Sequence, residues 1–164
     1  GAGFCYLDRV RLADRPARAI GWLSDTDPFD FDNRQVRVLP SNARSEMGCP
    51  PFAQIFALGA AVDYVSSIGV DAIAARILDL NMYLTTRLER EAFEVLSPGG
   101  PYRSGETLVR LPDPGRATAF LLDRGIHVTE KPEGIRIATH FYNDENEVDA
   151  CDDALVQWRE KLLL

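Results

Sequence analysis

The second half of this 164-residue sequence predicts a mixed α/β fold of the α+β type, with helices on one face of a mostly antiparallel sheet. Two observations support this prediction. After position 92, short apolar runs typical of strands alternate with turn residues and two helical segments. The order is strand, strand, helix, strand, strand, helix, which is typical of an α+β sandwich.

The first half begins with a short apolar run and continues with a long polar segment. Phe4 to Leu7 is continuously apolar and predicts a strand buried on both faces. Residues 8–51 are irregular and contain several prolines, so we expect a long loop, which in a compact domain is often functional. Pro50 and Pro51 then open a helix that Gly69 ends. One apolar face is predicted for this helix: Phe52, Ile55, Phe56, Val62 and Val65.

A second helix is expected from a cap at Asp71 to about Glu91, because leucine and isoleucine recur at steps of three and four. Strands are expected at Phe93 to Leu96, Thr107 to Leu111, Ile126 to Thr129 and Ile135 to Ala138. Asp113 and Pro114 predict the start of a short helix that ends at Gly125. Asn143 or Asp144 predicts the start of the last helix, and Glu147 completes a capping box with Asp144.

Composition restricts the function classes. The net charge of −7 argues against nucleic acid and anionic membranes as partners. No apolar stretch is long enough to span a bilayer, and no segment has the pattern of a signal peptide. Cys5, Cys49 and Cys151 are too few and too scattered for a disulfide framework, which favours a reducing, cytoplasmic setting. His127 and His140 lie near none of them in the sequence, so no metal site is predicted.

Arg136 is the first candidate binding residue, because it stands inside an otherwise apolar strand. Burying a guanidinium is costly unless it meets an anion, and its planar fork suits a carboxylate or a phosphate. The alternative is an arginine on the exposed face of an edge strand, paired with a neighbour such as Glu133. Spacing alone favours this alternative.

A second candidate site lies directly before the first helix. Gly48 and Cys49 precede Pro50, and a helix N-terminus offers backbone N–H groups and a positive dipole end to a phosphate. Trp22 in the irregular segment could cover a ligand and donate its indole N–H. Taken alone, the first pattern is more typical of an ordinary junction between a loop and a helix, and the second is more typical of a tryptophan that packs under its loop.

The order of these segments resembles the class V aminotransferase family of fold-type I pyridoxal-phosphate enzymes. Gly1-Ala2-Gly3-Phe4-Cys5 is similar to the stretch that follows the family's Schiff-base lysine. Glu46-Met47-Gly48-Cys49-Pro50-Pro51 is similar to its E-x-G-T-P stretch, with Cys49 in place of the usual threonine. Arg136-Ile137-Ala138-Thr139-His140-Phe141-Tyr142-Asn143 is similar to its R-I-S-x-H-x-Y-N segment. Gly21-Trp22 resembles a pair in kynureninase-like members.

The resemblance implies roles for these residues. Arg136 would bind the α-carboxylate of an amino-acid substrate. Trp22, Gly48 and Cys49 would lie at the phosphate of pyridoxal 5′-phosphate, in an active site that the family builds at the interface of a homodimer. The Schiff-base lysine would precede Gly1, so no catalytic residue is predicted here, and the chain alone should not catalyse.

The resemblance also implies a domain organisation. Residues 1–70 would be the C-terminal remnant of the large cofactor-binding domain, and residues 71–164 would be the C-terminal small domain, joined by a helical bridge. Family desulfurases carry a reactive cysteine before the arginine strand. The stretch from Gly125 to Gly134 is short and holds none, so we disfavour a desulfurase. Kynureninase-like hydrolases, isopenicillin-epimerase-like proteins, carbon–sulfur lyases and transaminases stay open.

Two further interpretations stand beside that of a pyridoxal-phosphate enzyme. The chain could be a non-catalytic binding or dimerisation module that keeps the small-domain fold, because a fold does not imply a function. It could also be an α+β domain with no role that the sequence reveals. This last interpretation requires the order of the motifs to be a coincidence.

Overall fold

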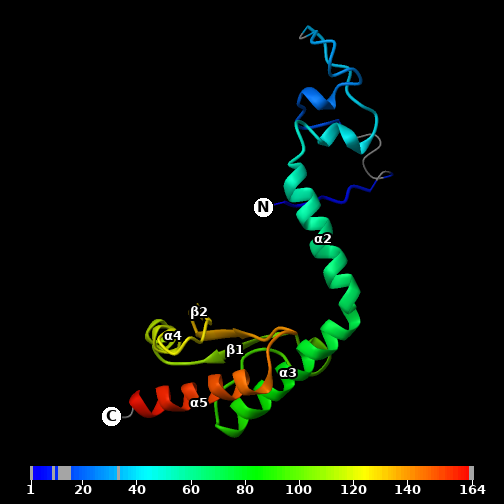
Figure 1. Cartoon of the computed structure of the whole chain (residues 1–164). Helices are drawn as coiled ribbons and strands as arrows, with labels where there is room; N and C mark the ends of the chain where they lie inside the picture. The colour runs from blue at the N-terminus through cyan, green and yellow to red at the C-terminus, as the bar shows by residue number, and fades with distance from the viewer. Residues whose placement is uncertain (1, 9, 11–15, 33, 163–164) are drawn as a thin grey trace. The chain divides into compact units, whose positions relative to one another are not determined.

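The structure, a computed structural model, describes residues 2–8, 10, 16–32 and 34–162 (Figure 1). Gly1, which belongs to the first of the matching motifs, lies outside the described residues. The chain divides into two compact units, Gly1–Ser67 and Ile68–Leu164. Among the described residues, the first unit consists mainly of irregular chain and one long helix, whereas the second consists of a sheet and three helices.

The first unit is largely irregular, as the sequence predicts. It contains two 3₁₀ turns, η1 (Trp22–Ser24) and η2 (Asn42–Ser45), followed by helix α2 (Phe52–Ile68). One isolated bridge joins Asp25 to Val38. The predicted strand at Phe4–Leu7 is wrong: these residues form no strand, Phe4 and Tyr6 are exposed, and no described strand pairs with them. An apolar run forms a strand only where a neighbouring strand satisfies its backbone groups.

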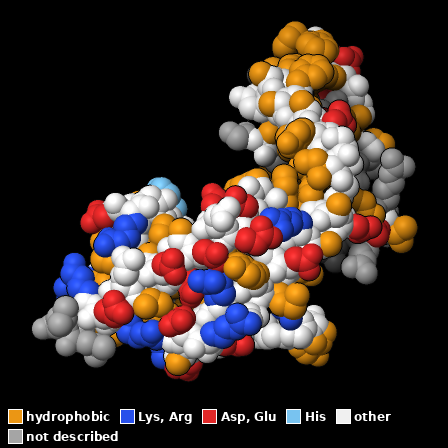
Figure 2. All heavy atoms as spheres, turned by 60° about the horizontal axis from the view of Figure 1, so that its bottom comes forward, with side chains coloured by type: hydrophobic (Ala, Val, Ile, Leu, Met, Phe, Trp, Pro, Cys, Tyr) orange, Lys and Arg blue, Asp and Glu red, His pale blue; other side chains and the backbone are white. Residues whose placement is uncertain are grey.

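Helix α2 has the predicted bounds but does not bury one face. None of its residues is buried, and apolar side chains occur all around it. Figure 2 shows hydrophobic side chains at the surface of this first unit. Among the described residues, no single helix is long and apolar enough to cross a membrane. Helices α2 and α3 (Val70–Arg90) meet that test only as a pair broken at Gly69.

The second unit has the predicted α+β architecture. Its elements are α3 (Val70–Arg90), η3 (Gly100–Tyr102), β1 (Glu106–Arg110), α4 (Pro114–Leu122), β2 (Thr129–Lys131), β3 (Gly134–Ala138) and α5 (Glu145–Leu162). The strands form an antiparallel sheet in the order β1-β3-β2, so β3 is central. Helix α5 packs on both α3 and α4, while α3 contacts β1 and α4 contacts β2 and β3 (Figure 1).

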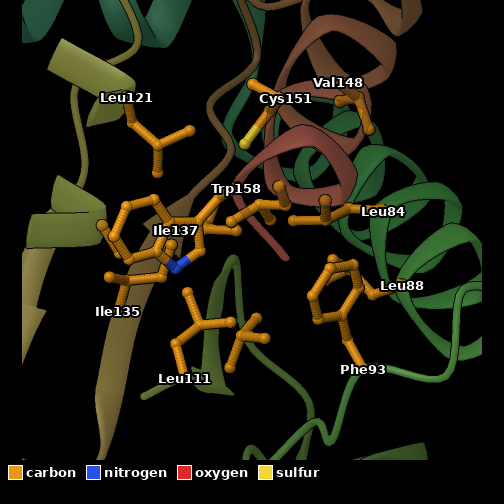
Figure 3. Packing of buried hydrophobic residues seen from close by; sticks show 14 of the residues in the cluster. Leu84, Leu88, Phe93, Leu111, Leu121, Ile135, Ile137, Val148, Cys151 and Trp158 are labelled. Carbon is orange, nitrogen blue, oxygen red and sulfur yellow. The ribbon is translucent and has the colours of Figure 1, made fainter. Parts of the chain in front are cut away.

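The hydrophobic core lies between the sheet and its helices. In Figure 3, Trp158 of α5 lies among Ile135 and Ile137 of β3 and Leu121 of α4. The core also receives leucines from α3, and every member comes from the second unit. A fully buried side chain of this size contributes about 1.5–3 kcal/mol, so this layer is the main source of stability in the second unit.

The helix starts in this unit follow local hydrogen-bond chemistry. The capping box at α5 is confirmed: Asp144 N donates to Glu147 Oε2 at 3.1 Å, and Glu147 N donates to Asp144 Oδ1 at 2.9 Å. Asp113 caps α4 as expected, accepting from Arg116 N. The predicted cap at Asp71 is wrong. Gly69 is the N-cap of α3, and Asp71 lies inside the first turn, where its charge still favours the helix dipole.

Two predicted strands differ from the structure. Phe93 to Leu96 forms only an isolated bridge between Val95 and Val109, because it pairs with β1 at a single position. The strand expected at Ile126 to Thr129 instead begins at Thr129, and Ile126 and Val128 pack against the core from a loop. Hydrophobic runs therefore predict core residues correctly here, but they do not predict which residues pair in the sheet.

Candidate functional site

In the first unit, residues 21–24 and 46–49 lie against each other and form what we call the Trp22–Gly48 cluster. A Cβ atom on Gly21 would lie 2.0 Å from the carbonyl oxygen of Met47, so only glycine fits there. Leu23 N donates to the same oxygen at 3.4 Å. This close backbone approach brings two distant segments together.

Ser24 anchors this cluster. Its side chain is fully buried, and its hydroxyl accepts from Gly21 N at 3.0 Å and donates to Arg44 O at 2.6 Å. Its carbonyl oxygen accepts from Leu39 N at 2.8 Å. One small polar residue thus ties together three parts of the irregular segment. Ser24 was not predicted from the sequence, because a serine in a loop carries no pattern.

The structure brings the predicted Trp22, Gly48 and Cys49 together. Trp22 Nε1 lies 3.8 Å from the position that a Cβ atom on Gly48 would occupy, and Cys49 follows, exposed, three residues before α2. The indole N–H, nearby backbone N–H groups and a helix N-terminus are all donors suited to a phosphate. The missing side chain of Gly48 leaves room for such a group, so these residues fit a phosphate-bearing cofactor.

Trp22 also borders a hollow that is lined by several carboxylates. Its ring packs edge-on against Phe29, with 5.7 Å between centroids, beside a hollow of about 360 Å³. Carboxylates line this hollow at positions 25, 27, 30 and 32. Backbone N–H groups of Asp27 and Arg37 hold the pKa of Asp25 below its usual value, so that carboxyl group is charged at neutral pH. Arg37 pairs with Asp25 and Asp30, and Arg34 pairs with Asp32, so the charge of these carboxylates is already partly balanced.

In the second unit, Arg136 occupies the middle of the central strand β3. Ile135 and Ile137 beside it are buried against the helices, so Arg136 lies on the opposite, open face of the sheet. Its Nη1 forms an ion pair with Glu106 Oε1 at 3.2 Å, and its Nη2 donates to Thr129 Oγ1 at 3.4 Å. The alternative of an exposed-face arginine on an edge strand, paired with a neighbour such as Glu133, is thus partly confirmed. Arg136 does lie on the open face and pairs with a carboxylate, but its strand is central and its partner is Glu106.

A hollow of about 340 Å³ lies around this guanidinium. Its lining is mostly polar: Ser97, Glu106, Leu108, Lys131, Glu133 and Arg136. Arg136 Nε is buried and has no hydrogen-bond partner among the described residues. A guanidinium with an unsatisfied N–H group beside a polar hollow can bind an anion.

The cysteine of the second unit has no nucleophilic role in this arrangement. Cys151 of α5 lies in the core, as the sequence predicts, and burial raises the pKa of its thiol to about 12. Cys5 and Cys49 are exposed and belong to the first unit. Within the described residues, no group of three or more His, Cys, Asp and Glu side chains could hold a metal ion.

Comparison with known proteins establishes the family. Residues 26–151 match the model of the family described as "Aminotransferase class-V", so the chain belongs to the class V aminotransferase family. Isopenicillin N epimerase of Amycolatopsis lactamdurans is 34% identical over 94% of this chain and 42% of its own length. A probable cysteine desulfurase of Pseudomonas putida is 33% identical over 75% of this chain and 34% of its own.

Solved structures show the same fold. The apo cysteine desulfurase of Thermococcus onnurineus NA1 matches with a TM-score of 0.78 at 20% identity, over 86% of this chain and 38% of that one. The cystine C–S lyase C-DES, solved with cysteine persulfide, matches with a TM-score of 0.68 at 21% identity, over 83% and 37%. The chain therefore spans less than half the length of these relatives.

These matches confirm the predicted family, its fold class, and pyridoxal phosphate as the cofactor of the family. They include relatives named as epimerases and as desulfurases, so they do not select one branch. The roles of Trp22, Gly48, Cys49 and Arg136, and the division at residue 70, stay predictions.

Proposed function

We propose that this chain is the C-terminal part of a pyridoxal-phosphate-dependent enzyme that acts on an amino acid, as an aminotransferase, a lyase or a kynureninase-like hydrolase. Arg136 binds the substrate α-carboxylate, and Trp22, Gly48 and Cys49 contribute to holding the cofactor phosphate. The complete enzyme is a cytoplasmic homodimer. The observation that carries this proposal is Arg136 itself, which has a buried, unpartnered Nε beside a polar hollow in a chain of this family.

The chemistry of the site supports a division of labour. When bound, pyridoxal phosphate withdraws electrons from the α-carbon of an amino acid. The residues of this chain bind and orient the substrate and the cofactor phosphate. A carboxylate held by the fork of Arg136 has a fixed direction, which determines the bond at the α-carbon that is aligned for cleavage. The rigid central strand restricts the position of that clamp.

The Trp22–Gly48 cluster supplies donors without a side-chain hydroxyl. Cys49 stands where the family motif has threonine, and a thiol is a weaker donor than a hydroxyl. The indole N–H and the backbone groups around Gly48 therefore carry most of the phosphate binding in this proposal. Cys49→Thr is expected to strengthen retention of pyridoxal phosphate.

We disfavour a desulfurase that uses a cysteine of the second unit. Strands β2 and β3 are joined by Pro132 and Glu133 alone, which leaves no room for a long loop bearing a reactive thiol. Cys151 is buried with a pKa of about 12, whereas persulfide chemistry requires an accessible thiolate. Relatives named desulfurases therefore support the family rather than this reaction.

Cys49 also favours the second candidate, a non-catalytic binding or dimerisation module. Loss of the hydroxyl at the phosphate would be the first step away from cofactor binding. This candidate requires that the complete protein, although folded, does not retain pyridoxal phosphate.

The test is the absorbance spectrum of the longer protein that carries this chain, after pyridoxal phosphate is added and excess removed by dialysis. The proposal predicts a retained visible band that borohydride abolishes. The 164-residue chain alone is the matched control, and we expect no retained band from it. A folded longer protein that retains no band would favour the module.

A further inference from the structure

Glu106 and Arg136 form a diagonal pair on the open face of the sheet. In the register of β1 and β3, Glu106 stands opposite Ala138, and Leu108 stands opposite Arg136. Diagonal neighbours on one face are within reach of long side chains. Glu106 Oε1 approaches Arg136 Nη1 at 3.2 Å, and both residues line the hollow of about 340 Å³.

The pair leaves the guanidinium incompletely satisfied. The side chains of Arg136 and Glu106 are 36% and 55% exposed, and an ion pair this exposed is weak because water screens it. Arg136 Nε is meanwhile buried without a partner among the described residues, and Nη2 reaches only Thr129 at 3.4 Å. A buried N–H group without a hydrogen-bond partner is unfavourable, because it has lost its hydrogen bond to water. A ligand carboxylate that satisfies two N–H groups of the fork would therefore replace Glu106.

We propose that Glu106 is an internal carboxylate that occupies Arg136 in the absence of substrate and is displaced by the substrate carboxylate. This inference rests on the proposed role of Arg136. Glu106 acts through Arg136 and is a positioning residue. Competition by Glu106 lowers the affinity of Arg136 for every anion. It thereby favours carboxylates that bind the guanidinium through both oxygens.

Glu133 provides a matched control. It lines the same hollow, and its replacement by glutamine removes the same charge. The ion pairs among the described residues include one between Arg136 and Glu106 but none between Arg136 and Glu133. Both Glu106→Gln and Glu133→Gln remove one negative charge from the hollow. Only Glu106→Gln also breaks the ion pair with Arg136.

The experiment is a titration of the ¹⁵N-labelled 164-residue chain with sodium acetate, at ionic strength kept constant with sodium chloride. The readout is the Arg136 Nε–H resonance, identified by its loss in Arg136→Lys. We expect acetate to shift this resonance in the parent chain. Glu106→Gln should bind acetate about two- to fivefold more tightly, while Glu133→Gln should differ from the parent by less.

Two results would overturn parts of this scheme and can be told apart. Equal acetate affinities in the two glutamine variants, with the Arg136 resonance responding in both, would refute the role of Glu106 and leave Arg136 as a carboxylate ligand. An Arg136 resonance that responds to acetate in no variant would refute carboxylate binding by Arg136, and the role of Glu106 with it.

Discussion

At the scale of single residues, the position of Arg136 within a strand could be predicted from the sequence, but the residues around its side chain could not. The sequence places an arginine among apolar residues, which marks it as unusual. Its ion-pair partner depends on the register of β1 against β3, which brings Glu106 close from far earlier in the chain. Local patterns carry no information about such a pair, so Glu106 was missed and Glu133 was wrongly considered.

Replacing Arg136 tests its role directly in the complete enzyme. We expect Arg136→Ala to raise KM for the amino-acid substrate about ten- to a hundredfold, because charge-assisted hydrogen bonds contribute about 1.5–3 kcal/mol. Arg136→Lys should lose less, since it keeps the charge but not the fork. Steady-state kinetics provide the measurement. Arg110→Ala, an exposed arginine of β1 paired with Glu94, is the control and should leave KM unchanged.

Gly134 is a second residue that must be glycine, because the backbone of the neighbouring strand β1 lies very close to it. A Cβ atom there would lie 1.8 Å from the carbonyl oxygen of Val109, so Gly134→Ala must separate β1 from β3. We expect the free energy of unfolding to fall by more than about 2 kcal/mol, as for other overpacked sites. Gly99→Ala, where a Cβ atom meets nothing within 4 Å, is the control in the same unit. Equal denaturation midpoints for the two variants would contradict this account.

At the scale of elements, helices could be predicted better than strands. Helix bounds follow from chemistry within a few residues, as the capping box of Asp144 and Glu147 and the stop at Gly69 show. A strand exists only with a partner. Phe4–Leu7 has none among the described residues, and Phe93 to Leu96 meets β1 at one position. The apolar content of these runs was interpreted correctly, but their pairing is decided elsewhere in the chain.

The contact between α3 and α5 contains a carboxylate whose charge opposes folding. Asp152 is buried, receives Arg87 Nε on Oδ2 at 3.1 Å, and leaves Oδ1 without a partner among the described residues. Burial raises the pKa of Asp152 above its usual value of 3.8, despite the attraction of Arg87. The native state therefore binds this proton more tightly than the unfolded chain does.

The sign of the pH dependence follows from this shift. The contribution of Asp152 to the free energy of unfolding is fully present below pH 3.8 and is lost as the pH rises through the raised pKa. We expect the free energy of unfolding of the parent minus that of Asp152→Asn to decrease as the pH rises over this interval. Urea denaturation of both proteins at several pH values measures it. A difference that stays constant or increases would contradict the raised pKa.

At the scale of the whole molecule, the two units differ in how their structure is held. Every member of the hydrophobic core lies between Leu80 and Trp158, inside the second unit. In the first unit, Ser24 is the single buried residue among those described, and α2 exposes its apolar side chains. Large exposed apolar surfaces mark places where other protein surfaces bind. The irregular first half could be predicted only coarsely, because local hydrogen bonds rather than a periodic core define it.

This difference predicts that residues 68–164 fold without the first unit. All core side chains and all three strands are retained, and Trp158 becomes the single tryptophan, so its fluorescence reports the core alone. We expect one cooperative urea transition for this fragment, followed by Trp158 fluorescence. Its midpoint should be close to that of the full chain carrying Trp22→Phe, in which Trp158 is also the single tryptophan. Leu88→Ala should lower the stability of both proteins equally, by about 2–5 kcal/mol, because its neighbours are the same in each. A fragment without a cooperative transition would show that the first unit supplies contacts that the core requires.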